Sequence, residues 1–371
     1  MSKSRWCSGL AWLLLATLLV CLGVLIYVLP DTMRKTFSPS HFIRHVSLGK
    51  TDYSEEVTYW EGRIAEMGGK AAYEELASGI SRFSILDQHV EAHTFGEALY
   101  KREPVEGFTV CDNQFGQGCW HAFFTTLVKG SGLQAGLSQL ERRCAEEDSI
   151  AERRTCDHGI GHAIESYMGY TSDALQESLT QCANLERHTD LGLGCYGGVF
   201  MEYNLHVMLQ FNETAPKQPS SGVEFLQPCT SVSSQYQDAC MFWQPFWWRR
   251  LLDSKERHEL YSLMGAHCDS AITLSSSAVE SCFKGVGYAA PLVTNYDATA
   301  TVDACAAVSG TAVGRVACWS WAFTQLRREA AHANAPRLCF GLDDFEKKYC
   351  EAHNFEHIDL THDVGVVSTE N

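Results

Sequence analysis

Apolar residues follow two patterns along the chain: one unbroken run near the N-terminus, then helical spacing over much of the rest. Residues 9–29, GLAWLLLATLLVCLGVLIYVL, form a run long enough to cross a bilayer as a helix. Residues 132–144, GLQAGLSQLERRC, and 171–182, TSDALQESLTQC, place apolar side chains three and four positions apart. That spacing gives a helix one buried face. The pattern predicts an all-α protein preceded by one transmembrane helix.

The residues around the N-terminal run predict its orientation. Lys3 and Arg5 precede it and Asp31 follows it, which favours a cytoplasmic N-terminus, although Arg34 and Lys35 weaken the asymmetry. The run ends in YVLPDTM, without the small-x-small cleavage site of a secretory signal. We therefore expect an uncleaved single-pass type II anchor. The expected segments are a cytoplasmic tail 1–8, the anchor 9–29, a juxtamembrane linker 30–60, an exported domain 61–358 and a polar tail 359–371.

Cysteines in the exported part occur in closely spaced couples. Their number is even and the compartment that the anchor predicts is oxidising, so local disulfides are the simplest interpretation. No couple has the C-x-x-C spacing of a zinc ribbon or a thioredoxin site, and every exported cysteine has a plausible partner, which disfavours a cysteine nucleophile. The couples are Cys111/Cys119, Cys144/Cys156, Cys182/Cys195, Cys229/Cys240, Cys268/Cys282, Cys305/Cys318 and Cys339/Cys350.

The second cysteines of the couples recur with the period of a repeat protein. They lie 37, 39, 45, 42, 36 and 32 residues apart, the range expected of helical hairpins. Each unit is expected to contain a helix ending at the first cysteine, a loop of about ten residues and a second helix starting at the second cysteine. The predicted fold is a helical-hairpin repeat array, either an α-solenoid or a tight superhelix, with intra-repeat disulfides.

This period and hairpin pattern resemble the Sel1 and tetratricopeptide class of α-solenoids over roughly residues 75–350. The tetratricopeptide consensus residues are absent, so the resemblance implies a shape and no functional residues. Such a shape offers a concave face for a protein or glycan partner.

Charge and motifs exclude several classes of function. The net charge of −16 argues against a nucleic-acid partner, because phosphate binding needs a basic face. No glycine-rich nucleotide loop, kinase signature or G-x-S-x-G elbow occurs, so no nucleotide cofactor is expected.

Histidines concentrate in the N-terminal half of the exported part. Two H-x-x-x-H pairs place both imidazoles on one face of a helix, within reach of one metal ion. His121 and His158 both lie two residues after a second cysteine, and equivalent positions of a repeat array stack side by side. The candidate ligands of a transition metal (Zn, Fe, Mn or Cu) are His89, His93, His121, His158, His162 and Glu202.

Neighbouring residues are candidates for supporting this site or for binding an anion in the same groove, and they are Glu165, His206, Lys284 and Tyr288. Helix starts at the second cysteines would add free N–H groups near His158. Glycines such as Gly159 and Gly161 are expected to serve close helix packing. Neither histidine pair has the H-E-x-x-H pattern of a metalloprotease.

The sequence leaves two classes of function open. One is a membrane-anchored metal-dependent protein, a hydrolase or an oxidoreductase, whose reaction the residues do not specify. The other is a non-enzymatic scaffold for a peptide, glycan or protein. The aromatic stretch MFWQPFWWRR, 241–250, is expected to be mostly core, with Pro245 in the first turn of its helix.

Overall fold

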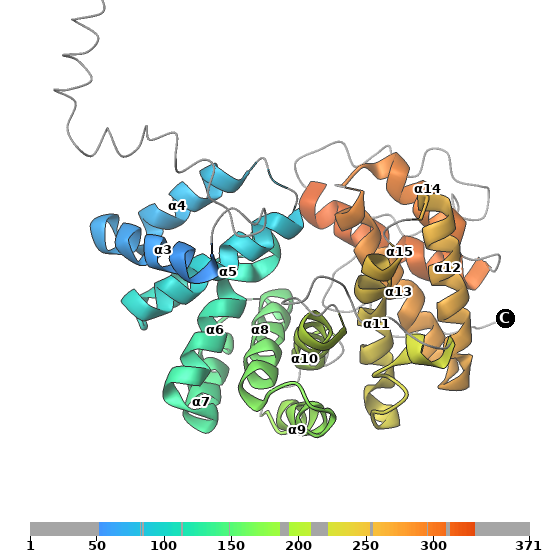
Figure 1. The fold of residues 1–371 in the computed structure, drawn as a ribbon, viewed down its shortest axis with the longest axis horizontal. Coiled ribbons are helices and arrows are strands. Elements are labelled where there is room, and N and C mark those ends of the chain that lie inside the picture. Colours follow the sequence, from blue (N-terminus) through green and yellow to red (C-terminus); the bar gives the residue numbers. More distant parts are fainter. Residues whose placement is uncertain are drawn as a thin grey trace, which may run out of the picture. The chain divides into compact units, whose positions relative to one another are not determined.

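The structure is a computed structural model, and it describes residues 52–330 apart from residues 82, 84, 113, 148, 186–192, 209–221, 253–254, 295 and 309–311. Every regular element among these residues is a helix, which confirms the all-α prediction (Figure 1). The α-helices are α3 (Tyr53–Met67), α4 (Gly69–Ile80), α5 (Ile85–Arg102), α6 (Gly118–Ser131), α7 (Leu133–Cys144), α8 (Ile150–Met168), α9 (Ser172–Ala183), α10 (Cys195–Tyr203), α11 (Ser234–Leu251), α12 (Arg257–Ser270), α13 (Ser276–Val293), α14 (Ala298–Val308) and α15 (Ala312–Ala330). Short helices are η3 (Glu106–Thr109), η4 (Phe115–Gln117), η5 (Asn204–Met208), η6 (Gly222–Leu226) and η7 (Ala271–Thr273).

The folded unit begins at Tyr53, inside the stretch 30–60 that was predicted to be a linker. Val57 and Trp60 of α3 are buried in the core, because α3 packs against α4 and α5. The predicted anchor 9–29 and the polar tail 359–371 lie outside the described residues. None of the described helices is long and apolar enough to cross a membrane.

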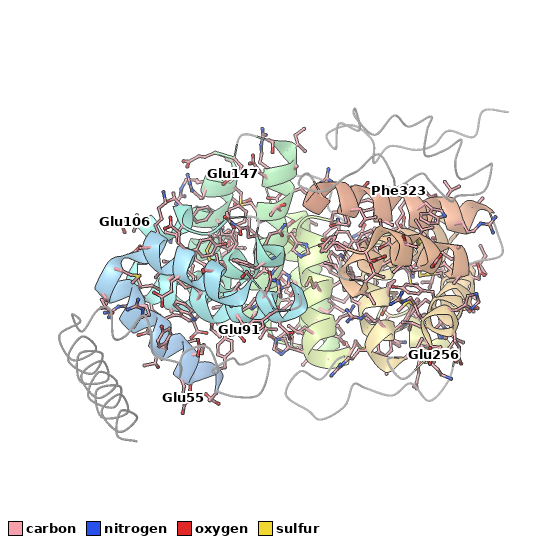
Figure 2. The ribbon with its side chains drawn as sticks, turned by 90° about the horizontal axis from the view of Figure 1, so that it is seen from above. Glu55, Glu91, Glu106, Glu147, Glu256 and Phe323 are labelled. Atoms are coloured by element: carbon pink, nitrogen blue, oxygen red, sulfur yellow. A yellow bond between two sulfur atoms is a disulfide. The ribbon has the colours of Figure 1, made fainter. Side chains whose placement is uncertain are left out.

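The helices form a repeated hairpin arrangement. Helices α5, α6, α8, α10, α11, α13 and α15 each contact the next, and we call this succession the central row. The intervening helices each pack against two members of the row: α7 on α6 and α8, α9 on α8 and α10, α12 on α11 and α13, and α14 on α13 and α15. Exposed acidic side chains such as Glu55, Glu106 and Glu256 lie at the periphery of the helices (Figure 2).

Six of the seven predicted disulfides are confirmed, and Cys339 and Cys350 lie outside the described residues. Their Cα atoms are 5.4–5.6 Å apart, within the ordinary range of a disulfide. Closing loops of this length contributes about 2–3 kcal/mol each in the chain-entropy account. Six such bonds indicate a protein that matures in an oxidising compartment. The confirmed bonds are Cys111–Cys119, Cys144–Cys156, Cys182–Cys195, Cys229–Cys240, Cys268–Cys282 and Cys305–Cys318.

The second cysteines do not mark the helix starts that were predicted for them, except in α10, which begins at Cys195. Helix α6 begins one residue early, at Gly118. Helices α8, α11, α13 and α15 begin several residues before their cysteines, which therefore lie inside the helices. The predicted start is wrong for Cys119, Cys156, Cys240, Cys282 and Cys318.

The physical reason for the earlier start is clear in α8. The Ser149 hydroxyl accepts from the Glu152 N–H, and the Glu152 carboxylate accepts from the Ser149 N–H. This capping box satisfies N–H groups of the first turn and fixes the helix start ahead of Cys156. His158 therefore lies in the helix interior, and the predicted helix-start anion site beside it is wrong.

Glycines let neighbouring helices of the central row cross in backbone contact. A Cβ on Gly161 would overlap the carbonyl oxygen of Cys195, and one on Gly198 would overlap that of His158. Helices α8 and α10 therefore approach each other reciprocally, and Gly96 and Gly118 play the same part between α5 and α6. The prediction that glycines serve close packing is confirmed at these positions. Close approach brings side chains from adjacent helices within reach of one another.

We expect Gly198→Ala to destabilise the protein by about 3 kcal/mol or more, because the added methyl group must push α8 and α10 apart. Gly62→Ala is the matched control: Gly62 lies inside α3 with nothing within 4 Å of an added Cβ. That change should stabilise the helix by about 0.5–1 kcal/mol. Urea unfolding of both variants measures the difference, and equal stabilities would contradict the close crossing.

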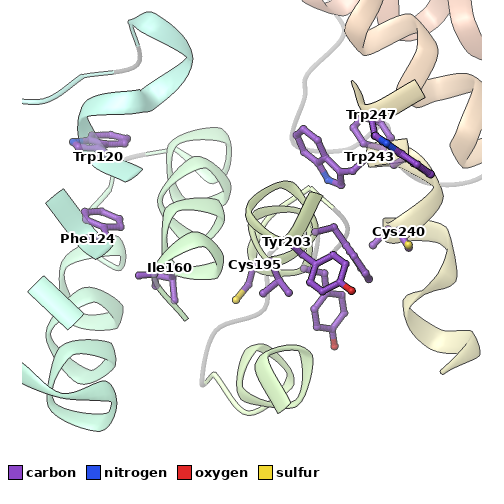
Figure 3. Packing of buried hydrophobic residues seen from close by; sticks show 14 of the residues in the cluster. Trp120, Phe124, Ile160, Cys195, Tyr203, Cys240, Trp243 and Trp247 are labelled. Atoms are coloured by element: carbon purple, nitrogen blue, oxygen red, sulfur yellow. The ribbon is translucent and has the colours of Figure 1, made fainter. Parts of the chain in front are cut away.

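Large aromatic side chains are buried where the helices of the central row pack against one another. This confirms the prediction that the aromatic stretch 241–250 is mostly core. Trp247 and Trp248 of α11 are 1% and 0% exposed. Figure 3 follows these buried side chains from Trp120 on α6 to Trp243 and Trp247 on α11. Pro245 lies in the interior of α11, so its predicted place in the first turn is wrong.

Candidate metal centre

Two helices of the central row each carry a histidine pair on one face. On α5, Nε2 of His93 lies 3.1 Å from Nε2 of His89. On α8, Nε2 of His162 lies 3.3 Å from Nε2 of His158. A separation of four residues puts both side chains over the same helical turn, as predicted. In each pair, the two outer ring nitrogens therefore face each other across a short gap.

The first histidine of each pair is held by a backbone carbonyl group that lies just before the next helix of the row. His89 donates its Nδ1–H to the Phe115 oxygen, at 2.9 Å, and His158 donates its Nδ1–H to the Leu193 oxygen, also at 2.9 Å. A carbonyl oxygen can only accept, so the ring proton of each neutral imidazole lies on Nδ1. Nε2 of both histidines then presents a lone pair to the centre.

His162 is oriented by a carboxylate instead. It donates its Nδ1–H to Glu202 Oε2, at 2.8 Å, and both groups are buried. Nε2 of His162 lies 3.3 Å from the lone pair on Nε2 of His158. A proton or a metal ion between these two nitrogens holds them at this distance. A carboxylate behind a histidine is the usual arrangement that orients a metal ligand.

His121 of α6 lies between the two pairs. Its ring centroid is 5.2 Å from that of His89 and 5.4 Å from that of His158. The prediction that the equivalent positions 121 and 158 lie side by side is therefore confirmed. His121 is 1% exposed, and neither of its ring nitrogens has a hydrogen-bond partner. Leaving both nitrogens without a partner costs about 1–3 kcal/mol for each buried group, which a bound ion would remove.

The five imidazoles form two overlapping groups whose candidate ligand atoms lie within 4.8 Å of one another: His89, His93 and His121, and His121, His158 and His162. Three neutral imidazoles suit Zn, Cu or Fe, and the cysteines near them are all in disulfides. The donor set and the partnerless nitrogens of His121 thus fit a transition metal.

Burial keeps four of these imidazoles neutral, those of His89, His93, His121 and His158. Desolvation lowers the pKa of His89 to about 4. Burial, helped by the neighbouring imidazoles, also holds the pKa values of His93, His121 and His158 well below the usual value. The neutral imidazole is the form that binds a metal ion, so no proton has to be displaced from a charged ring near neutral pH.

Glu202 lies behind His162 rather than among the ring nitrogens of the centre. Its Oε1 accepts from the Tyr170 hydroxyl at 2.9 Å and lies 3.1 Å from His206 Nε2. Burial raises the pKa of Glu202, but hydrogen bonds from His162 and His206 outweigh that effect and hold it well below its usual range. Glu202 is therefore an anion that links His162 to Tyr170 and His206, and His206 has the supporting place that was predicted for it.

The other predicted supporting residues do not join this group. The Lys284 ammonium pairs with Glu280 of its own helix at 2.8 Å. Tyr288 packs against Phe242, Trp243 and Trp321. Glu165 is fully buried in α8, and its carboxyl group lies near the Ser178 hydroxyl of α9 rather than among the imidazoles.

The buried carboxyl group of Glu165 predicts a pH dependence of stability. Burial, with a smaller contribution from the charge of Glu202, raises its pKa to about 8. Between the unfolded pKa of about 4.3 and this value, the folded state keeps a proton that the unfolded state has lost, so stability falls as pH rises. Relative to the wild type, Glu165→Gln should gain on the order of 1–4 kcal/mol from about pH 4.5 to about pH 8. Urea unfolding at both pH values tests this, and parallel profiles would contradict it.

Sequence reasoning missed three partners of the centre. The carbonyl groups of Phe115 and Leu193 carry no side-chain signature, so no residue pattern could have identified them. Tyr170 follows α8 and could have been found only from the packing of α8 against α10. Trp243, whose ring centroid lies 5.1 Å from that of His158, was assigned to the core, where it also belongs.

No known protein family matches the chain, and no curated protein or solved structure is similar enough to count as a match.

Proposed function

We propose that this protein is an exported metalloprotein whose transition metal is bound by imidazoles of α5, α6 and α8. One observation carries the proposal: the buried nitrogens of His121 have no hydrogen-bond partner, and they lie beside the His158/His162 pair, whose Nε2 atoms are 3.3 Å apart. Without an ion, both nitrogens of His121 stay unsatisfied. With an ion, one of them becomes a ligand together with Nε2 of His158 and Nε2 of His162.

The ligand set favours a reactive centre over a structural one. Structural zinc sites have four protein ligands, whereas catalytic sites have three and a free position for water or substrate. Each group of the centre supplies three imidazoles. The metal would supply a Lewis acid or a redox couple, and the protein supplies the orientation of the ligands. Glu202 fixes the ring of His162 and contributes a negative charge that stabilises a cation. A hydrolase or an oxidoreductase for a small substrate fits this arrangement.

The wider setting is part of the same proposal. We place the helical repeats outside the cytoplasm, anchored by a helix over residues 9–29, in a solenoid of the Sel1 and tetratricopeptide kind. The six disulfides and the hairpin packing of the central row support an exported repeat protein.

A second candidate function is a binding scaffold without catalysis. The partly exposed rings of Phe246, Tyr288 and Trp321 lie together on α11, α13 and α15 and pack against the buried core. Such amphipathic aromatic surfaces bind glycans and peptides. Metal content separates this candidate from the first.

Elemental analysis of the purified full-length protein tests the proposal. We expect at least about one equivalent of Zn, Cu or Fe per chain, either as purified or after incubation with each ion and desalting. His258→Ala is the control, because His258 is an exposed histidine of α12 and should leave the content unchanged. Less than about a tenth of an equivalent, with no uptake of any of the three ions, would reject the metal centre and favour the scaffold.

A further inference from the structure

His121 belongs to both groups of imidazoles, and it is the one residue that they share. Its ring lies against both pairs: the centroid is 5.2 Å from His89 and 5.8 Å from His93 on one side, and 5.4 Å from His158 and 4.1 Å from His162 on the other. A single ion served by one pair would use one nitrogen of His121 and leave the other nitrogen buried without a partner.

The two pairs repeat one design, which argues that each serves an ion. In both, the first histidine donates Nδ1–H to a loop carbonyl oxygen at 2.9 Å, and its Nε2 faces the Nε2 of the second histidine. The Nε2 separations are 3.1 Å and 3.3 Å. A pair that only filled space in the core would not need the same carbonyl contact in both places.

We propose that the centre binds two metal ions and that His121 bridges them through its two ring nitrogens. One ion is held by His89, His93 and His121, and the other by His121, His158 and His162. This inference rests on the proposed function, because it presupposes that the imidazoles bind a metal at all. A neutral imidazole carries one proton on its two nitrogens, so bridging requires that proton to leave for the solvent as the second ion binds.

The two ions are not equivalent. His158 and His162 are buried, whereas His89 and His93 are partly exposed. Glu202 adds a negative charge beside His162 alone. We expect a chelator to remove the ion at His89 and His93 first, at least about ten times faster than the ion at His158 and His162.

Loading the full-length protein with Cu(II) tests the bridge. We expect about two equivalents per chain by elemental analysis. Two Cu(II) ions joined through one imidazolate couple magnetically, so the EPR signal should integrate to clearly less than the copper content. His93→Ala should hold about one equivalent, with a full uncoupled signal, and His158→Ala should do the same. His258→Ala again serves as the control and should match the wild type.

The outcomes separate this inference from the proposed function. No bound copper contradicts this inference, and it contradicts the proposed function as well if Zn and Fe are not taken up either. One equivalent in the wild type supports the metal centre and overturns the second ion. Two equivalents with a signal that equals the copper content overturn the bridge through His121. The last measurement uses the unaltered protein, so it does not depend on the folding of any variant.

Discussion

His121→Leu should stabilise the metal-free protein and at the same time remove most of the stabilisation that metal provides. Leucine fills a similar volume and has no polar atoms, whereas the two nitrogens of His121 are buried without partners. Removing unsatisfied buried groups gains about 1–3 kcal/mol. In the wild type, metal at about a thousand times its Kd adds about 4 kcal/mol, and each group of the variant keeps only two imidazoles.

The test is urea unfolding of the wild type and His121→Leu, each with a chelator and with saturating Zn. The order of stability should reverse: the variant is more stable with the chelator, and the wild type is more stable with Zn. A variant that gains as much from Zn as the wild type would show that His121 is not a ligand. If His121 only fills space in the core, the stability difference between the wild type and the variant will be the same with the chelator and with Zn.

Glu202→Gln should lower metal affinity by about 10- to 100-fold, the range expected when a carboxylate behind a histidine ligand is removed. The amide keeps the size of the side chain, but it removes the negative charge that now accepts from His162 and Tyr170. A neutral amide oxygen accepts more weakly from the His162 N–H, so His162 becomes a poorer ligand.

Glu165→Gln is the matched control for this change. Both glutamates are buried and lie on adjacent helices, but Glu165 contacts none of the imidazoles by a hydrogen bond. We expect its metal affinity to stay within about threefold of the wild type. Competition titrations against a chromophoric chelator measure both affinities. Equal losses in the two variants would show that Glu202 acts through general stability and not through His162.

Much of the fold follows from local spacing in the sequence. Each cysteine couple joins two consecutive segments of the chain, so its pairing does not depend on distant parts of the sequence. The six described disulfides are the predicted ones. The predicted starts of the second helices are wrong because the disulfide cysteine does not set the helix boundary. The residues that set the boundary are Ser149 and Glu152 in α8 and Ser275 in α13, whose hydroxyl accepts from the Ala278 N–H. Such capping residues are a signal that the sequence itself carries.

The candidate site could be predicted in its members but not in its geometry. Spacing of four residues identified both histidine pairs, and the repeat identified His121 as the equivalent of His158. The distance between the pairs depended on how closely α5, α6 and α8 approach, which is set by backbone contacts at glycines such as Gly118 and Gly96. The role of Glu202 depended on the crossing of α8 and α10, so a sequence alone could not distinguish a ligand from a residue that orients one.

X-ray absorption at the K-edge of the bound metal is the most direct test that imidazoles of α5, α6 and α8 hold it. The account predicts a first shell of nitrogen or oxygen at about 2.0 Å with the multiple scattering of several imidazoles, and no sulfur. His121→Leu should reduce the imidazole scattering or leave no metal to measure. Sulfur scattering at about 2.3 Å, or an oxygen shell without imidazoles, would place the metal at cysteines or carboxylates and contradict the account.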